Sequence, residues 1–133
     1  MRTVHSEDHR RHFPQAELSA GQFVTPYERP SRVEYVLAEL KARGLADIVA
    51  PDPPDPAALA AIHPADYLDF LRSANAMWRD AGREGDAVGY VWPVVGRRPL
   101  TLSRIDALLG RYSYDAGTPI TSETWDAAYW GAQ

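Results

Sequence analysis

The sequence predicts an α/β protein with a parallel sheet, flanking helices and a large share of loop. The first observation is an opening strand, helix and strand, an order that places two parallel strands in one sheet when the crossover is right-handed. The second is the set of eleven prolines, clustered at 51–56, which favours a loop-rich scaffold over a helix bundle. The third is a last helix, from Ser122, without a stop signal, so residues 1–133 are expected to form an incomplete single domain.

The first strand is expected at 3–5, where Val4 follows a β-branched threonine. Residues 6–22 are polar, and Pro14 and Gly21 predict an irregular loop without regular structure. Loops longer than about 12–15 residues are usually functional or disordered, so this segment is the first candidate for a binding surface, with simple disorder as the alternative.

A helix is predicted from Ser31 to Gly44. Ser31 and Glu34 have the spacing of a capping box, and the apolar face has helical spacing through Val33, Val36, Leu37 and Leu40. A short strand at 47–50 follows and completes the strand, helix and strand unit.

Two further helices are predicted before the second loop. Asp55 and Pro56 suit the cap and first position of a short helix that ends at His63 and Pro64. The next helix is expected at 65–81 and stops at Gly82, with an apolar face formed by Tyr67, Leu68, Leu71 and Trp78.

The segment 82–104 is predicted to be a second long loop, and the stretch from Tyr90 to Val95 is too apolar for a freely solvated one. We expect it to pack on a partner surface or another subunit. A short helix at 105–112 and a turn at 117–119 lead to the last helix, whose apolar face comprises Trp125, Ala128, Tyr129 and Ala132. That face is expected to be covered by protein outside this sequence; a frayed helix packed on its own domain is the alternative.

Composition excludes several classes of function. The chain has no cysteine, so it has no disulfide framework, thiolate zinc site or thiol nucleophile. Its net charge is −4 and no basic stripe is interleaved with aromatics, which argues against nucleic acid as a partner. Neither a signal-peptide h-region nor a stretch of about 20 apolar residues occurs, so a cytoplasmic protein without membrane association is expected.

No complete active site is visible in the sequence. His5, His9 and His12 have a spacing that would gather three imidazoles on one side of a helix, but Phe13 and Pro14 interrupt such a helix, so solvated loop histidines are the preferred interpretation over metal binding. His63, before a proline, is more typical of a structural histidine than of a catalytic one. Nucleophile elbows and glycine-rich phosphate loops are absent.

Several strings, taken in order, resemble the start of the zinc-dependent histone deacetylase superfamily, in its bacterial acetylpolyamine amidohydrolase branch. The most specific string is His63 to Leu71. The other matching strings are 6–9, 16–18 with Gly21, 24–28, Pro30 with Arg32, Trp92-Pro93 and 120–128.

The resemblance implies an arginase/deacetylase-like α/β sheet of which this chain is the N-terminal portion. It also implies deacetylation of acetylpolyamines or acyl-lysine by a zinc ion, held by an Asp-x-His pair and a second Asp, with histidines and a tyrosine handling protons and the oxyanion. None of these motifs occurs in the chain, so the resemblance assigns it no catalytic or metal residue and no zinc of its own.

The residues that the resemblance carries over concern substrate. Loops 6–30 and 82–104 correspond to loops that line the channel mouth, and the second also builds the contact of a homodimer. Glu17 matches an acidic residue of the first loop, and Asp106 falls where the family has a carboxylate after the second; both would attract a cationic polyamine. A further acidic position is Gly117 here, with Asp115 close enough to replace it. A non-catalytic module that binds a cationic, polyamine-like ligand is the alternative.

Overall fold

The computed structural model of the chain describes residues 2–90, 101–113, 115 and 117–132. The segment 91–95 of the predicted apolar stretch lies outside the described residues. The elements, in order, are β1 (Arg2–Val4), the 3-10 helix η1 (Glu7–Arg11), β2 (Glu17–Ser19), β3 (Gln22–Val24), α1 (Ser31–Ala42), β4 (Asp47–Val49), α2 (Pro56–Ile62), α3 (Ala65–Asp80), α4 (Ile105–Tyr112) and α5 (Thr124–Gly131).

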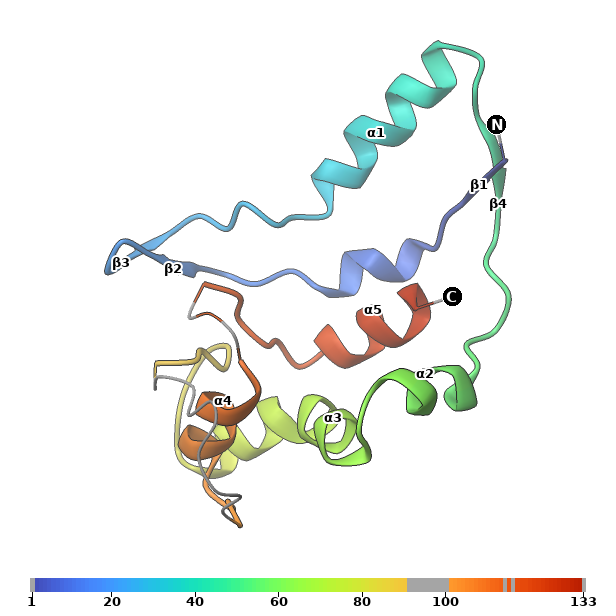
Figure 1. The fold of residues 1–133 in the computed structure, drawn as a ribbon. Coiled ribbons are helices and arrows are strands. Elements are labelled where there is room, and N and C mark those ends of the chain that lie inside the picture. Colours follow the sequence, from blue (N-terminus) through green and yellow to red (C-terminus); the bar gives the residue numbers. More distant parts are fainter. Residues whose placement is uncertain (1, 91–100, 114, 116, 133) are drawn as a thin grey trace.

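The parallel pair predicted from the first strand, helix and strand is confirmed. β1 pairs with β4 in parallel, with Thr3 opposite Ile48 and Val4 opposite Val49, and α1 lies in the connection between them. In Figure 1 this pair lies at one edge of the molecule, with α1 standing apart from α3, α4 and α5. Sheet and helices together confirm the α/β class.

The prediction that residues 6–22 lack regular structure is wrong. Ser6 caps η1 by accepting a hydrogen bond from the Asp8 N–H, and β2 and β3 pair in an antiparallel hairpin. Its two-residue turn has φ +49° at Ala20 and φ +78° at Gly21. Two positive φ angles are what a tight hairpin turn requires, but alanine rarely adopts one, so the sequence did not announce this turn.

The helices at 56–62, 65–80 and 105–112 agree with the predictions to within a residue or so. The Asp55 side chain caps α2 by accepting from the Ala57 N–H. Two predicted caps are wrong. Pro30, not Ser31, precedes α1, and neither α1 nor α5 has a side-chain bond at its assigned cap.

The start of α5 is organised by two threonines instead of Ser122. The Thr121 N–H donates to Thr124 Oγ1 at 2.8 Å, and the Glu123 N–H donates to Thr121 Oγ1 at 3.2 Å. The reciprocal bonds have the pattern of a capping box, with Thr124 where Glu or Gln is usual. Ser122 is exposed.

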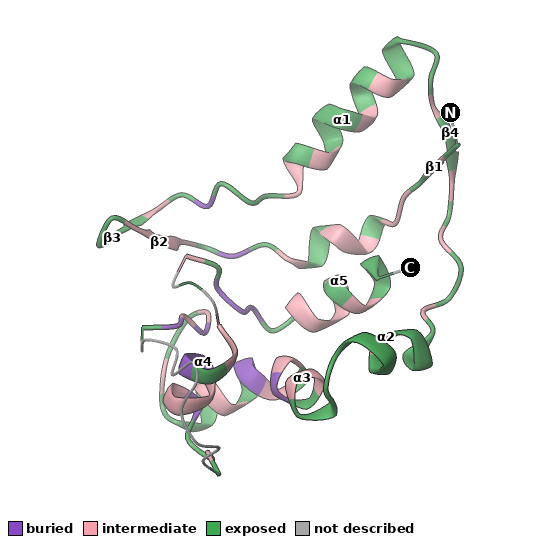
Figure 2. Cartoon of the chain, viewed as in Figure 1, coloured by how far each residue is buried: buried purple, intermediate pink, exposed green. Residues whose placement is uncertain are grey.

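The core lies between α3 and α4 and is small. Its buried apolar residues are Phe70, Ala74, Ala87, Ile105, Leu109 and Ile120. Figure 2 shows buried positions on α3 and α4 and in the segment that leads to α5, while α1 and α2 are exposed or half-buried throughout. An isolated bridge joins Ala87 to Ile120, and buried Asn75 of α3 donates to the Ile120 carbonyl at 3.0 Å, which fastens the two loops to the core.

The surface is large for the chain's size. The accessible area is 9321 Å², whereas a compact monomer of this mass has about 7,000 Å². Much of the excess is apolar: Tyr35 and Val36 of α1 are 75% and 59% exposed, and Phe23 is 71% exposed. α5 packs on η1 and is half-buried on that side, while Trp130 is 38% exposed.

Candidate functional site

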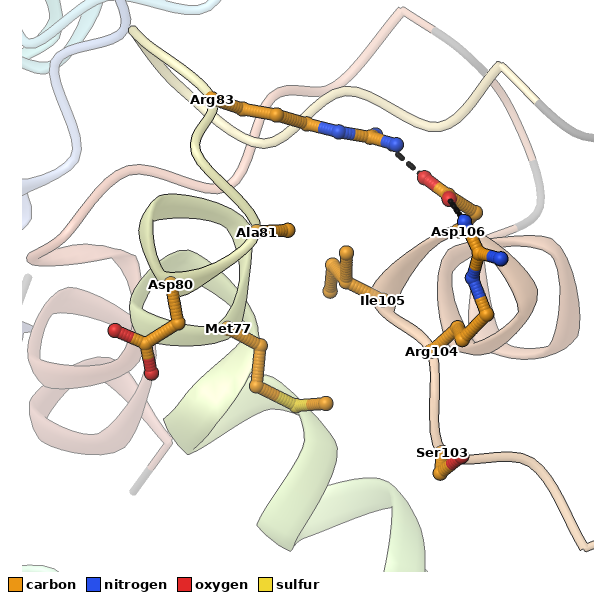
Figure 3. Close-up of a pocket in the computed structure, with 8 residues that line it drawn as sticks. All are labelled: Met77, Asp80, Ala81, Arg83, Ser103, Arg104, Ile105 and Asp106. Atoms are coloured by element: carbon orange, nitrogen blue, oxygen red, sulfur yellow. Dashed lines mark ion pairs between the residues drawn. The ribbon is translucent and has the colours of Figure 1, made fainter.

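A pocket of about 370 Å³ lies where the end of α3 meets the start of α4, and it contains Asp106. Its apolar floor is formed by Met77, Ala81 and Ile105, and its polar rim by Asp80, Arg83, Ser103, Arg104 and Asp106. Figure 3 shows Arg83 reaching across the mouth towards the Asp106 carboxylate. Asp106 is in the first turn of α4, where the helix dipole favours a negative charge.

The Asp106 carboxylate is held by three side chains. Arg83 forms an ion pair with it at 2.5 Å, Arg104 at 3.6 Å, and the Tyr90 hydroxyl donates to it at 2.5 Å. The Tyr90 hydrogen bond first, and Arg83 second among the favourable contacts, lower the pKa of Asp106 below its ordinary value. Asp106 is therefore a carboxylate at neutral pH, and its charge is already countered within the chain.

Arg83 connects three parts of the fold. Its guanidinium lies over the ring of Trp78 at 4.5 Å and near that of Tyr90 at 5.3 Å while it pairs with Asp106. The hydrogen bond to Asp106 is the main reason why its pKa is raised. These contacts fix the beginning of the second loop to α3 and α4. They join four residues: Trp78, Arg83, Tyr90 and Asp106. Sequence reasoning missed Arg83 and Tyr90 as parts of this site.

Glu17, the other residue expected to meet substrate, lies in a different place. It begins β2, is partly exposed, and accepts a hydrogen bond from the Tyr27 N–H at 3.0 Å. It does not line the pocket around Asp106. The structure therefore does not bring the two carboxylates together in one pocket.

Asp115 is engaged in a turn. Its carboxylate accepts from the Gly117 N–H at 2.8 Å and from the Thr118 N–H at 2.9 Å. A Cβ at Gly117 would meet the Leu18 carbonyl at 3.6 Å, which places this turn against the β2–β3 hairpin.

A second polar cluster joins α3 to α4. The Tyr112 hydroxyl donates to Asp66 at 2.6 Å, and Arg111 pairs with the same carboxylate at 3.3 Å. The hydrogen bond from Tyr112 lowers the pKa of Asp66, and burial is the main reason why the pKa of Tyr112 is raised. Asp66 belongs to the string at 63–71, and the structure shows that it links two helices.

The three N-terminal histidines have separate partners. His5 contacts Glu7 at 3.3 Å, His9 Nδ1 bonds to the Ser6 carbonyl at 2.8 Å, and His12 Nδ1 bonds to Thr124 Oγ1 at 2.9 Å. Within the described residues no group of three or more metal-binding side chains could hold an ion, so these residues do not fit a zinc ion. Exposed His63 packs against the ring of Tyr67 at 5.3 Å between centroids.

Comparison with solved structures defines the class of fold. The chain superposes on the crystal structure of an acetylpolyamine aminohydrolase from Burkholderia pseudomallei with a TM-score of 0.84 and 30% identity, covering 98% of this chain and 37% of that one. The chain therefore has part of an acetylpolyamine aminohydrolase-like α/β fold. None of the described helices is long and apolar enough to cross a membrane.

Comparison of sequences gives the particular relatives. The chain is 41% identical over its whole length to acetylpolyamine amidohydrolase 1 of Pseudomonas aeruginosa, and 38% identical over 96% of its length to the acetylpolyamine amidohydrolase of Mycoplana ramosa. It spans only 39% and 38% of those relatives. No protein-family model matches. The resemblance predicted from the sequence is thus confirmed, for about two fifths of the relatives' length.

Proposed function

We propose that this chain is one part of a zinc-dependent amidohydrolase that deacetylates acetylpolyamines or acyl-lysine. The observation that carries the proposal is the agreement, over nearly the whole chain, of both sequence and fold with acetylpolyamine amidohydrolases. In this proposal the metal and the reacting groups come from protein outside this chain, which agrees with the finding that the described residues do not fit a zinc ion.

In this proposal the chain contributes walls of the substrate channel and a surface for a homodimer, in the cytoplasm. The loops at 6–30 and 82–104 carry these roles, with Glu17 and Asp106 near the cationic part of the substrate. Glu17 is the better placed of the two, because its carboxylate is partly exposed and accepts only a backbone N–H among the described contacts. Asp106 attracts the cationic substrate less strongly, because Arg83 and Arg104 counter its negative charge.

The alternative is a non-catalytic module that binds a cationic ligand without zinc. Both proposals agree with the finding that the described part of the chain contains no group of three metal-binding side chains. The two proposals differ in whether the chain completes an enzyme.

A chimera tests the enzymatic proposal. The chain would be joined to the region of the Pseudomonas aeruginosa relative that the similarity does not cover, and release of acetate from an acetylpolyamine would be measured with and without a zinc chelator. We expect chelator-sensitive deacetylation that neither piece shows alone, and a higher KM in the Glu17→Gln chimera because one attraction for the ammonium groups is lost. The matched control is Glu39→Gln, on exposed α1.

A folded, zinc-loaded chimera without deacetylase activity would contradict the enzymatic proposal. Saturable polyamine binding by that inactive protein would then favour the module.

A further inference from the structure

A second pocket, of about 440 Å³, lies between the β2–β3 hairpin and the end of α3. Leu18 and Phe23 of the hairpin form one side, and Trp78 and Tyr90 form the other. Glu84 and Asp86, from the turn after α3, add two carboxylates. The pocket thus joins the two loops that the proposed function places at the substrate channel.

The charge of this pocket differs from that of the pocket around Asp106. Among the described residues no lysine or arginine lines it, whereas Arg83 and Arg104 line the other. Arg83 does lie over the Trp78 ring, but its charge is countered by Asp106 at 2.5 Å. A cation entering the second pocket therefore meets two carboxylates and no unpaired basic group among the lining residues.

Two hydrogen bonds between lining residues hold the Glu84 backbone and the Asp86 carboxylate in place. The Trp78 indole N–H donates to the Glu84 carbonyl at 3.0 Å, and the Gln15 N–H donates to the Asp86 carboxylate at 3.1 Å. Gly85, at φ +71°, forms the turn that separates the two acidic residues. The Glu84 side chain is exposed and forms no ion pair within the described part of the chain. Its carboxylate is therefore available to a ligand.

We propose that this pocket binds the chain of a linear aliphatic polyamine, with methylene groups on the aromatic and aliphatic walls and ammonium groups at Glu84 and Asp86. A flexible alkyl chain with charged nitrogens matches both features. Burial of its methylene groups against the apolar walls is favourable, and the aromatic faces and carboxylates attract cations. The inference rests on the proposed function for its substrate class, and it assigns recognition to residues other than Glu17 and Asp106.

Calorimetric titration of the chimera described above tests this assignment. The probes are 1,8-diaminooctane, octylamine and 1,8-octanediol, which share one alkyl chain and differ in charge. We expect the diamine to bind most tightly and the diol to bind least. Glu84→Gln and Asp86→Asn should each weaken the diamine by up to about fivefold, as expected for partly exposed ion pairs, and together by about tenfold or more. Asp86→Asn retains a side-chain oxygen that can accept from the Gln15 N–H, so the turn is kept.

Asp69→Asn is the matched control, because exposed Asp69 of α3 lines neither this pocket nor the pocket around Asp106. It should leave diamine affinity unchanged, and circular dichroism should show that all variants remain folded. Equal weakening by Asp69→Asn, no weakening by the other two variants, or no saturable diamine binding by the unsubstituted chimera would overturn the assignment. These results leave the proposed function standing, since the chimera reports deacetylation independently. An inactive chimera with the expected diamine binding would overturn only the proposed function.

Discussion

At the scale of single residues, Asp106 is ionised, but neighbouring side chains counter its charge. Its pKa is lowered by the Tyr90 hydroxyl and by Arg83, and the two arginines around it outnumber it. Arg83 also lies over two aromatic rings, which a lysine would not reproduce with the same planar contact. Asp106 therefore organises the second loop whatever its effect on substrate.

His12 gives the residue-scale prediction, a dependence of stability on pH. Burial is the main reason why its pKa is lowered, and the more distant Asp86 and Glu28 only oppose this. The unfolded chain, with an ordinary histidine pKa of about 6.5, therefore binds the proton more readily than the folded chain. The free energy of unfolding should fall as the pH drops through about 6.5, until the folded-state pKa is reached.

The measurement is the melting temperature of the chimera between about pH 7.5 and pH 5.5, a range that brackets the ordinary histidine pKa. His12→Asn, which retains a polar atom near Thr124, should reduce the fall. Equal pH dependence in wild type and His12→Asn would contradict this account.

At the scale of elements, the start of α5 allows a test between the cap seen in the structure and the cap expected from the sequence. The structure assigns the helix start to the Thr121 and Thr124 pair, and leaves Ser122 exposed. Thr121→Val keeps the shape of the side chain but removes the acceptor for the Glu123 N–H, so it should lower the free energy of unfolding by about 1 kcal/mol. Ser122→Ala should change it by less than about 0.5 kcal/mol. Urea unfolding of the chimera carrying each variant is the measurement, and the reverse order would show that Ser122 is the cap.

The elements that the sequence predicted well are those with local signals. Asp55 and Pro56 start α2 and Gly82 follows α3, because caps, prolines and positive-φ glycines act within a turn of the chain. The β2–β3 hairpin was missed because Ala20 adopts a positive φ against its preference. The pairing of β2 with β3 depends on contacts that no local sequence pattern predicts.

The site was predictable only in part, for the same reason. Asp106 was singled out through the family resemblance, but its partners Arg83 and Tyr90 come from a loop without periodicity. The pocket containing Glu84 and Asp86 depends on how the hairpin meets the end of α3. Contacts between segments so far apart in the sequence can be identified only once the fold is known.

At the scale of the whole molecule, many large apolar side chains remain exposed because the core is too small to bury them. Six buried apolar residues form the core of the described part, while α1 has no buried residue and presents Tyr35 and Val36 to solvent. The sheet is a parallel pair, although parallel sheets are normally covered on both faces. These features agree with the finding that the chain spans about two fifths of its relatives.

The central claim is that this chain forms one domain together with the region of its relatives that it does not span. Mixing the chain with that region of the Pseudomonas aeruginosa relative, produced separately, and measuring mass by light scattering tests it most directly. We predict an equimolar complex, less binding of hydrophobic dye than the two pieces show apart, and one cooperative melting transition. A chain that stays monomeric in the mixture, melts cooperatively alone and binds no dye would contradict the claim.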